Sequence, residues 1–325
     1  MFLFSCLFSV SSMSWWPAWL GLEFSVIWFF PLMNLEFMKS SKSSVWLMFS
    51  LSCLSSMGLL LSLFILKYLV EFNSSVNSWL MMSFLFLSMK MGLPPFHNWY
   101  LDVGDNLDSW SFMVLMTAFK VPSLVFLMNT FLTLSNLSLI LMLYALYALY
   151  ASMAGIFSYS MRRMLIYSSI LNVVWSLVSL FYSLSLFLTF YCIYFNSFCV
   201  FWLLKEWNSL KRFEETILAN REALILGLSL ANLAGMPPLS MFFMKMKIIS
   251  SVMMDKQVSL IVLTTASLIS TTLMLWIYMS IFYSSTLWKV NSFYYTKSVN
   301  FSLLKMSIWV ISFSLVSVGI ALTFM

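Results

Sequence analysis

Four ionisable side chains stand inside long apolar stretches of this chain. They are Glu23, Lys90, Lys120 and Lys245, and Lys247 closely follows the last of them. Charged groups in such stretches pair with one another or with backbone carbonyls, and they commonly mark ion or proton pathways. These residue types could therefore take up and release protons inside a membrane.

Glu23 and Lys90 are the predicted ion pair of this set. Burial disfavours the ammonium form of a lysine, whereas a neighbouring carboxylate favours it, so such a lysine can exchange a proton when its partner moves. Driving one charge across a membrane costs about 2.3 kcal/mol per 100 mV, which such pairs can supply. The alternative is that these lysines only lock helices together or extend toward the headgroups.

Helix-breaking residues accompany the three lysines. They are Gly92, Pro94 and Pro95 after Lys90, Pro122 after Lys120, and Gly235, Pro237 and Pro238 before Lys245. Proline lacks an N–H and crowds the carbonyl four residues earlier, so it interrupts helical hydrogen bonds. Within lipid, such breaks are tolerated only where protein or water covers the backbone, which predicts polar cavities there. His97, the only histidine, is either a proton relay or a structural residue near a helix end.

The composition is that of a polytopic, all-α membrane protein. The 325 residues are 62% hydrophobic and 9% charged, against about 25% charged residues in soluble domains. The net charge of +6 comes from basic residues scattered in short loops, which argues against nucleic-acid binding.

Motifs for nucleotides, metals and redox centres are missing from the sequence. It contains no glycine-rich dinucleotide motif and no P-loop, and its four cysteines form no Cys-x-x-Cys pair. We interpret Cys6, Cys53, Cys192 and Cys199 as buried thiols, and we expect no cofactor or metal in this chain.

Apolar runs of the length that a membrane helix needs predict about eleven spans. They cover residues 1–12, 15–33, 45–70, 77–101, 109–128, 132–157, 164–182, 185–204, 222–253, 258–284 and 302–324. The first is short.

Basic residues gather in every second loop. These loops hold Lys39, Lys42, Arg162, Arg163, Lys205, Lys211, Arg212, Arg221, Lys289 and Lys297, with Lys305 at the margin, and the others hold Lys67 and Lys256. The positive-inside rule then places the N-terminus on the basic side, the bacterial cytoplasm or mitochondrial matrix, and the C-terminus opposite. The acidic loop at 102–108 departs from the pattern, but acidic residues count little in this rule.

Two Gly-x-Pro-Pro motifs, at 92–95 and 235–238, interrupt the fourth and ninth spans. Five spans separate them, so the broken helices run in opposite directions, as in inverted-repeat transporters that bind their cargo at mid-membrane. We predict a first five-helix repeat over 1–130, an inverted second repeat over 131–285, and a loop with a C-terminal helix over 286–325.

Several segments resemble the chain 2 family of mitochondrial NADH:ubiquinone oxidoreductase, respiratory complex I. They are Ala18–Glu23, Lys90–Trp99, Met116–Lys120, Arg162–Ile170 with Trp175, and Gly235–Lys245. The resemblance runs collinearly from about residue 15 to 250, and the last 75 residues match only in hydropathy.

This resemblance implies an antiporter-like, eleven-helix subunit of the proton-pumping membrane arm. Glu23 and Lys90 would form the pair of one half-channel, and Lys245 would serve a second half-channel. Lys120 would be the connecting lysine between them. The implied location is the mitochondrial inner membrane, with the N-terminus in the matrix and the C-terminus in the intermembrane space. The implied partners are membrane lipids and other membrane-arm subunits, including neighbouring antiporter-like chains. The assembly would use NADH, flavin mononucleotide, iron–sulfur clusters and ubiquinone.

The sequence departs from the family pattern at several positions. Asn172 stands where a histidine is usual, Ala118-Phe119 where Trp-Gln is usual, and Met244 and Met246 where Pro and Trp are usual. The asparagine puts a proton-relay role for the seventh span in doubt. Two other readings remain: a free-standing cation/proton antiporter of the same fold, and a scaffold whose buried charges only hold helices in place.

Overall fold

The structure is a computed structural model, and its helices account for all the regular elements in the part of the chain that it describes. Those residues are 2–12, 14–36, 42–71, 76–131, 137–158, 160–203, 220–237, 239–255 and 257–287. The chain divides into two compact units, Met1–Tyr147 and Ala148–Met325.

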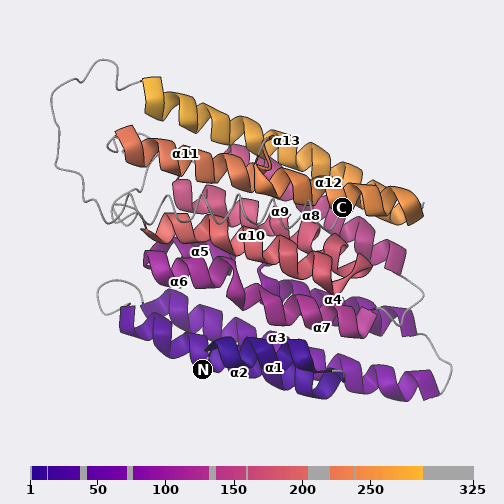
Figure 1. Ribbon diagram of the computed structural model, residues 1–325. Helices are drawn as coiled ribbons and strands as arrows, with labels where there is room; N and C mark the ends of the chain where they lie inside the picture. The colour runs from indigo at the N-terminus through magenta and orange to yellow at the C-terminus, as the bar shows by residue number, and fades with distance from the viewer. Residues whose placement is uncertain are drawn as a thin grey trace. The chain divides into compact units, whose positions relative to one another are not determined.

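The first unit contains the helices that carry Glu23, Lys90 and Lys120. In chain order they are α1 (Phe2–Ser11), α2 (Trp15–Glu36), α3 (Lys42–Glu71), α4 (Val76–Met91), α5 (Asn98–Asn106), α6 (Ser109–Met116), the 3₁₀ turn η2 (Ala118–Lys120) and α7 (Val121–Phe131) (Figure 1). Helix α2 packs against α1, α3 and α7, while α4 packs against α3 and α7. The glutamate of α2 and the lysine of α4 therefore belong to one packed group of helices.

The second unit contains the helices around Lys245. They are the C-terminal part of α8 (Leu137–Ile156), then α9 (Met161–Tyr182), α10 (Leu184–Leu203), α11 (Asn220–Ala234), α12 (Ser240–Asp255) and α13 (Val258–Leu287). Helix α9 is the most enclosed of these, because it is buried along almost its whole length and packs against α10, α12 and α13. Its N-cap is Ser160, whose hydroxyl accepts a hydrogen bond from the Arg163 N–H, a common way to begin a helix.

Among the described residues, five helical stretches are long and apolar enough to cross a membrane, with α6, η2 and α7 counted as one stretch. They cover Ser43–Leu66, Ser109–Leu127, Ser138–Ile156, Met161–Tyr182 and Val258–Ser280. Many large apolar side chains on these and other helices are exposed, including Trp46, Leu61 and Trp276. An apolar surface of this kind fits a lipid environment and confirms the multi-pass class that the composition predicts.

The predicted spans between residues 1 and 284 coincide with single helices or with broken helix pairs. The interruptions lie between α4 and α5, between α6 and α7, and between α11 and α12, which are the spans with predicted breaks. The last predicted span, 302–324, lies outside the described residues, as does most of the expected C-terminal segment. The span total and the repeat boundaries at 130 and 285 stay predictions.

The cysteines differ from the expectation of four buried thiols. All four are free, but only Cys6 is buried; Cys53 and Cys199 are partly exposed, and Cys192 is exposed. The interpretation as buried thiols was therefore wrong for three of them. The reason is that an apolar run in a membrane helix has an outer face as well as an inner one, and run composition does not separate the two.

Candidate functional site

The break after Lys90 is a glycine-capped helix end. Gly92 has a φ of +68°, in the left-handed region that glycine adopts without strain. The Gly92 N–H donates to the Met89 carbonyl at 3.3 Å, and the Leu93 N–H donates to the Ser88 carbonyl at 2.9 Å. These two bonds form a Schellman motif, which satisfies carbonyls that the end of α4 would leave unpaired. The Phe96 N–H then closes a turn on the Leu93 carbonyl at 2.9 Å.

The break before Lys245 repeats the same hydrogen bonds in the other unit. Gly235 has a φ of +83°. Its N–H donates to the Asn232 carbonyl at 2.9 Å, and the Met236 N–H donates to the Ala231 carbonyl at 3.0 Å. The Leu239 N–H closes a turn on the Met236 carbonyl at 2.9 Å. Both predicted breaks at the Gly-x-Pro-Pro motifs are thus confirmed; Pro238 itself lies outside the described residues.

The helix that carries Lys120 is broken a few residues before Pro122. Helix α6 ends at Met116, Thr117 has φ −113° and ψ −89°, and Lys120 ends the 3₁₀ turn η2. Pro122 lies in the first turn of α7, where a missing N–H is tolerated. Its ring excludes a regular helix because it would crowd the Ala118 carbonyl. That carbonyl instead accepts from the Val121 N–H and, at 3.6 Å, from the Cys6 thiol of α1.

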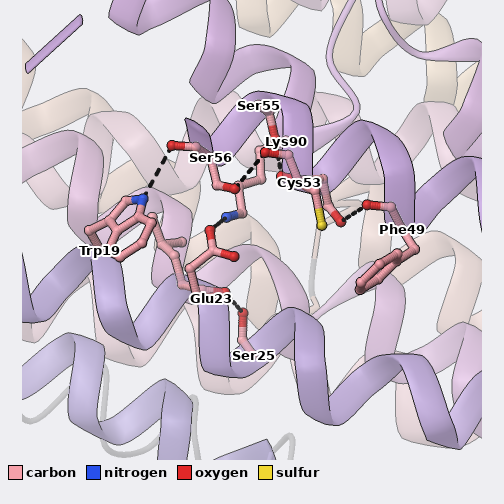
Figure 2. Close-up of polar contacts among 10 residues, drawn as sticks. Trp19, Glu23, Ser25, Phe49, Cys53, Ser55, Ser56 and Lys90 are labelled. Carbon is pink, nitrogen blue, oxygen red and sulfur yellow. Dashed lines mark hydrogen bonds and ion pairs between the residues drawn. The ribbon is translucent and has the colours of Figure 1, made fainter. Parts of the chain in front are cut away.

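Glu23 and Lys90 form the ion pair that the sequence predicts. The Lys90 Nζ lies 3.1 Å from Glu23 Oε1, and the lysine side chain is 2% exposed while the glutamate side chain is 20% exposed. Figure 2 shows the lysine of α4 reaching the carboxylate of α2, with the α3 residues Cys53 and Ser56 beside them. Near the pair, the Trp19 indole N–H of α2 donates to the Ser56 carbonyl of α3 at 3.3 Å. The pair is therefore held between three packed helices.

Lys120 is buried against an aromatic ring. Its Nζ lies 4.6 Å from the centroid of the Tyr100 ring, and both side chains are almost fully enclosed. An ammonium over a ring face is stabilised by the negative charge of the π system. Phe119, the preceding residue, packs its ring against that of Phe29 of α2, with the two ring centroids 5.2 Å apart.

Lys245 is held at the break that precedes it. Its Nζ donates to the Ala234 carbonyl, the last residue of α11, at 2.9 Å, and lies 5.6 Å from the centroid of the Trp175 ring of α9. A Cβ added to Gly235 would lie 3.1 Å from Lys245 Nζ. The glycine therefore leaves the space through which the lysine reaches the helix end.

The remaining sequence-predicted residues occupy distinct places. His97 is buried as the residue that precedes α5, and its carbonyl accepts from the Tyr100 N–H at 3.0 Å. Asn172 is buried on α9, one turn before Trp175. Lys247 is less buried than Lys245 and lies on a different side of α12.

The structure brings the predicted residues together in two groups. Glu23 joins Lys90, and Lys120 lies in the same unit, whereas Lys245 belongs to the second unit. Tyr100 and Trp175, which face the ammonium groups of Lys120 and Lys245, were missed by the sequence reasoning. Trp175 belongs to a segment that carries the family resemblance, but nothing in the sequence marks either ring as a partner of a lysine, because 18% of the chain is aromatic. Over the described residues, no group of three or more His, Cys, Asp and Glu side chains is placed to hold a metal ion.

Structures of known proteins share this fold. A chain of respiratory complex I from Thermus thermophilus with bound aureothin superposes with a TM-score of 0.76 at 16% identity, over 98% of this chain and 75% of that one. A chain of the Mrp complex from Dietzia sp. DQ12-45-1b gives a TM-score of 0.65 at 14% identity, over 85% of this chain and 58% of that one.

Sequence relatives extend the likeness to almost the whole chain. NADH-ubiquinone oxidoreductase chain 2 of Anopheles gambiae is 28% identical over 98% of this chain and 93% of its own length. The same protein of Metachirus nudicaudatus is 30% identical over 87% of this chain and 83% of its own length. The family model described as NADH:quinone oxidoreductase/Mrp antiporter, TM matches residues 12–271. The chain therefore belongs to this antiporter-type transmembrane family and, within it, to the family of NADH-ubiquinone oxidoreductase chain 2.

Proposed function

We propose that this chain is a non-redox membrane-arm subunit of NADH:ubiquinone oxidoreductase, and that it carries protons across the inner mitochondrial membrane through Glu23, Lys90, Lys120 and Lys245. The observation that carries this proposal is the 3.1 Å ion pair between Glu23 and Lys90, placed beside a capped helix break in an apolar helix group. Hydrophobic packing alone has no need of such a pair, because replacing buried ion pairs by apolar residues is often neutral or stabilising.

The pair supplies a site where a proton can be exchanged. While Glu23 lies against Lys90, the carboxylate and the ammonium stabilise each other. When they separate, desolvation favours the neutral amine, so the Lys90 proton can move to another acceptor. Breaks beside Lys90, Lys120 and Lys245 add backbone carbonyls that can orient water near each ammonium.

The family membership supports the assembly in which this chemistry is driven. We propose other membrane-arm subunits, including neighbouring antiporter-like chains, and membrane lipids as its partners. NADH, flavin, iron–sulfur clusters and ubiquinone would serve the assembly in other chains, because this sequence contains no nucleotide or cluster motif. The N-terminus would face the matrix and the C-terminus the intermembrane space.

Neutral replacements at Glu23 and Lys120 test the proposal in the assembled complex. With Glu23→Gln or Lys120→Met, we expect the complex to assemble while the number of protons translocated per NADH oxidised falls. Ser25→Ala is the matched control for Glu23→Gln, because Ser25 lies on the same helix and its hydroxyl donates to the Leu22 carbonyl of that helix. Proton translocation and NADH oxidation are measured in sealed vesicles. The amount of assembled complex is measured on native gels, and the proton yield is normalised to it.

The competing readings predict different results, one in the same assay and the other with the isolated chain. A scaffold predicts the reverse pattern, with unchanged proton yield per assembled complex and less assembly. A free-standing cation/proton antiporter, which the fold shared with the Mrp complex supports, predicts monovalent-cation exchange by the isolated chain in vesicles. Either outcome would overturn the proposed function.

A further inference from the structure

Tyr100 lies where two helix breaks of the first unit meet. It is on α5, the nine-residue helix between the break after α4 and the start of α6. Its side chain is fully buried. Its Cβ is so close to Gly92 that a Cβ added to this glycine would lie 2.8 Å away. The residue therefore contacts the capped end of α4 at the break that follows Lys90.

The other end of the Tyr100 side chain reaches the second break. Its hydroxyl lies 3.3 Å from the Leu115 carbonyl and 3.1 Å from Met116 Sδ, in the last turn of α6. The last carbonyls of a helix have no partner inside that helix, so a buried hydroxyl donor there satisfies a group that the break leaves available. This bond fixes the phenol ring relative to the residues that lead into η2.

Between these two anchors, the ring face is presented to Lys120. The ammonium lies 4.6 Å from the ring centroid, within the roughly 6 Å range of cation–π attraction. Trp99, the neighbour of Tyr100, donates from its indole to the Met89 carbonyl at 3.2 Å. Helix α5 is thus tied to the end of α4 through Trp99 and to the end of α6 through Tyr100.

We propose that Tyr100 is a positioning residue for proton transfer: it holds the Lys120 ammonium with its ring, and it mechanically joins the break after Lys90 to the break that carries Lys120. A change at the Gly92 break, where Lys90 meets Glu23, is then transmitted to Lys120 through one rigid side chain. This inference rests on the proposed function, since it assigns Tyr100 a part in the same proton path.

Substitutions separate the ring from the hydroxyl. Tyr100→Leu removes both, and we expect it to lose a share of the proton yield comparable to that lost in Lys120→Met. Tyr100→Phe keeps the ring over the ammonium but loses the bond to the Leu115 carbonyl that fixes it, and we expect a loss of yield smaller than that of Tyr100→Leu. Tyr144→Leu is the control, because Tyr144 is an equally buried tyrosine of the same unit whose ring packs against Phe84 and Tyr147. We expect it to leave the yield per assembled complex unchanged.

The double variant Tyr100→Leu/Lys120→Met decides whether Tyr100 acts through Lys120. If it does, the double variant translocates as many protons per NADH as Lys120→Met alone, a result that a structural defect would not produce. If the two losses multiply, or if Tyr100→Leu keeps the parent yield while Lys120→Met loses it, the inference is wrong and the proposed function stands. An unchanged yield in Lys120→Met would instead remove the proposed function. Should Tyr100→Leu not assemble, Tyr100→Met, which also lacks the ring, carries the same comparisons.

Discussion

The three buried lysines are held by chemically different contacts. Lys90 meets a carboxylate, Lys120 meets an aromatic face, and Lys245 meets a backbone carbonyl and an indole face. A carboxylate carries a full charge that can itself be protonated, whereas a ring or a carbonyl cannot exchange protons at neutral pH. Of these three contacts, Glu23–Lys90 is therefore the one that could pass a proton between its own two partners.

Lys245 and Lys247 form a matched pair for substitution on α12. In Lys245→Met, the hydrogen bond to the Ala234 carbonyl is lost, and we expect a lower proton yield with an assembled complex. In Lys247→Met, we expect the parent yield, because this lysine is less buried and lies on a different side of the helix. Proton uptake by vesicles, per assembled complex, measures both, and equal losses in the two variants would contradict a specific role for Lys245.

The Glu23–Lys90 pair was predictable from the sequence, but the aromatic contacts were not. Glu23 is a rare carboxylate in an apolar run. Few lysines lie in such runs, so Glu23 has few possible partners. Tyr100 and Trp175 belong to an abundant residue class, and their function depends on which ring happens to face an ammonium. Side-chain direction of that kind follows from packing between helices that are distant in sequence, which local patterns do not encode.

Among the helices, the two Gly-x-Pro-Pro breaks share one construction. In each, the helix ends at a glycine with positive φ and is capped by the same pair of hydrogen bonds. The chain then continues into the same kind of turn. The sequence predicted these breaks because glycine and proline act locally on the backbone. The exact residues of the η2 break were harder to predict, since Pro122 acts on a carbonyl four residues earlier.

Alanine at Gly92 or Gly235 should destabilise the corresponding break. An L-residue in the left-handed region costs roughly 1–2 kcal/mol. At Gly92, a Cβ would also lie 2.8 Å from the Tyr100 Cβ, which cannot move without shifting α5. We therefore expect Gly92→Ala to lower the free energy of unfolding more than Gly235→Ala, where the tight neighbour is the flexible end of Lys245.

Gly155→Ala on α8 is the reference for this comparison. A Cβ there would meet the flexible Met274 side chain at 2.8 Å, and the residue has no positive φ. Thermal denaturation of the purified complex ranks the three variants, and a midpoint for Gly155→Ala below that of Gly92→Ala would refute the explanation by backbone conformation.

Across the whole chain, each compact unit contains a buried lysine beside a capped helix break. The first unit holds Glu23, Lys90 and Lys120, and the second holds Lys245. An inverted repeat would produce this distribution, because each copy would carry its own broken helix and its own lysine. The boundary between the units lies inside α8, after Tyr147. The two five-helix repeats that the sequence predicts over 1–130 and 131–285 stay a prediction.

The predicted orientation can be tested with one added cysteine at either end of the second unit, since the parent chain has four free cysteines of its own. Arg163 is exposed at the start of α9, and Met254 is 83% exposed at the end of α12. The distribution of basic residues places the first on the matrix side and the second on the other. We expect Arg163→Cys to react with a membrane-impermeant maleimide only in inside-out vesicles, and Met254→Cys only in intact mitoplasts, with the parent chain as background. The opposite pattern would reverse the topology.

Both glycine-capped helices have a lysine at their C-terminal ends. Lys90 belongs to the last turn of α4, and the Lys245 ammonium bonds the final carbonyl of α11. The aligned peptide dipoles give a helix C-terminus roughly half a negative charge. Part of the attraction for a cation is therefore built into the main chain, where no side-chain substitution can remove it. Neutralising Glu23 should accordingly reduce the electrostatic stabilisation of the Lys90 ammonium without abolishing it. Removing that stabilisation completely would also require a change of the backbone.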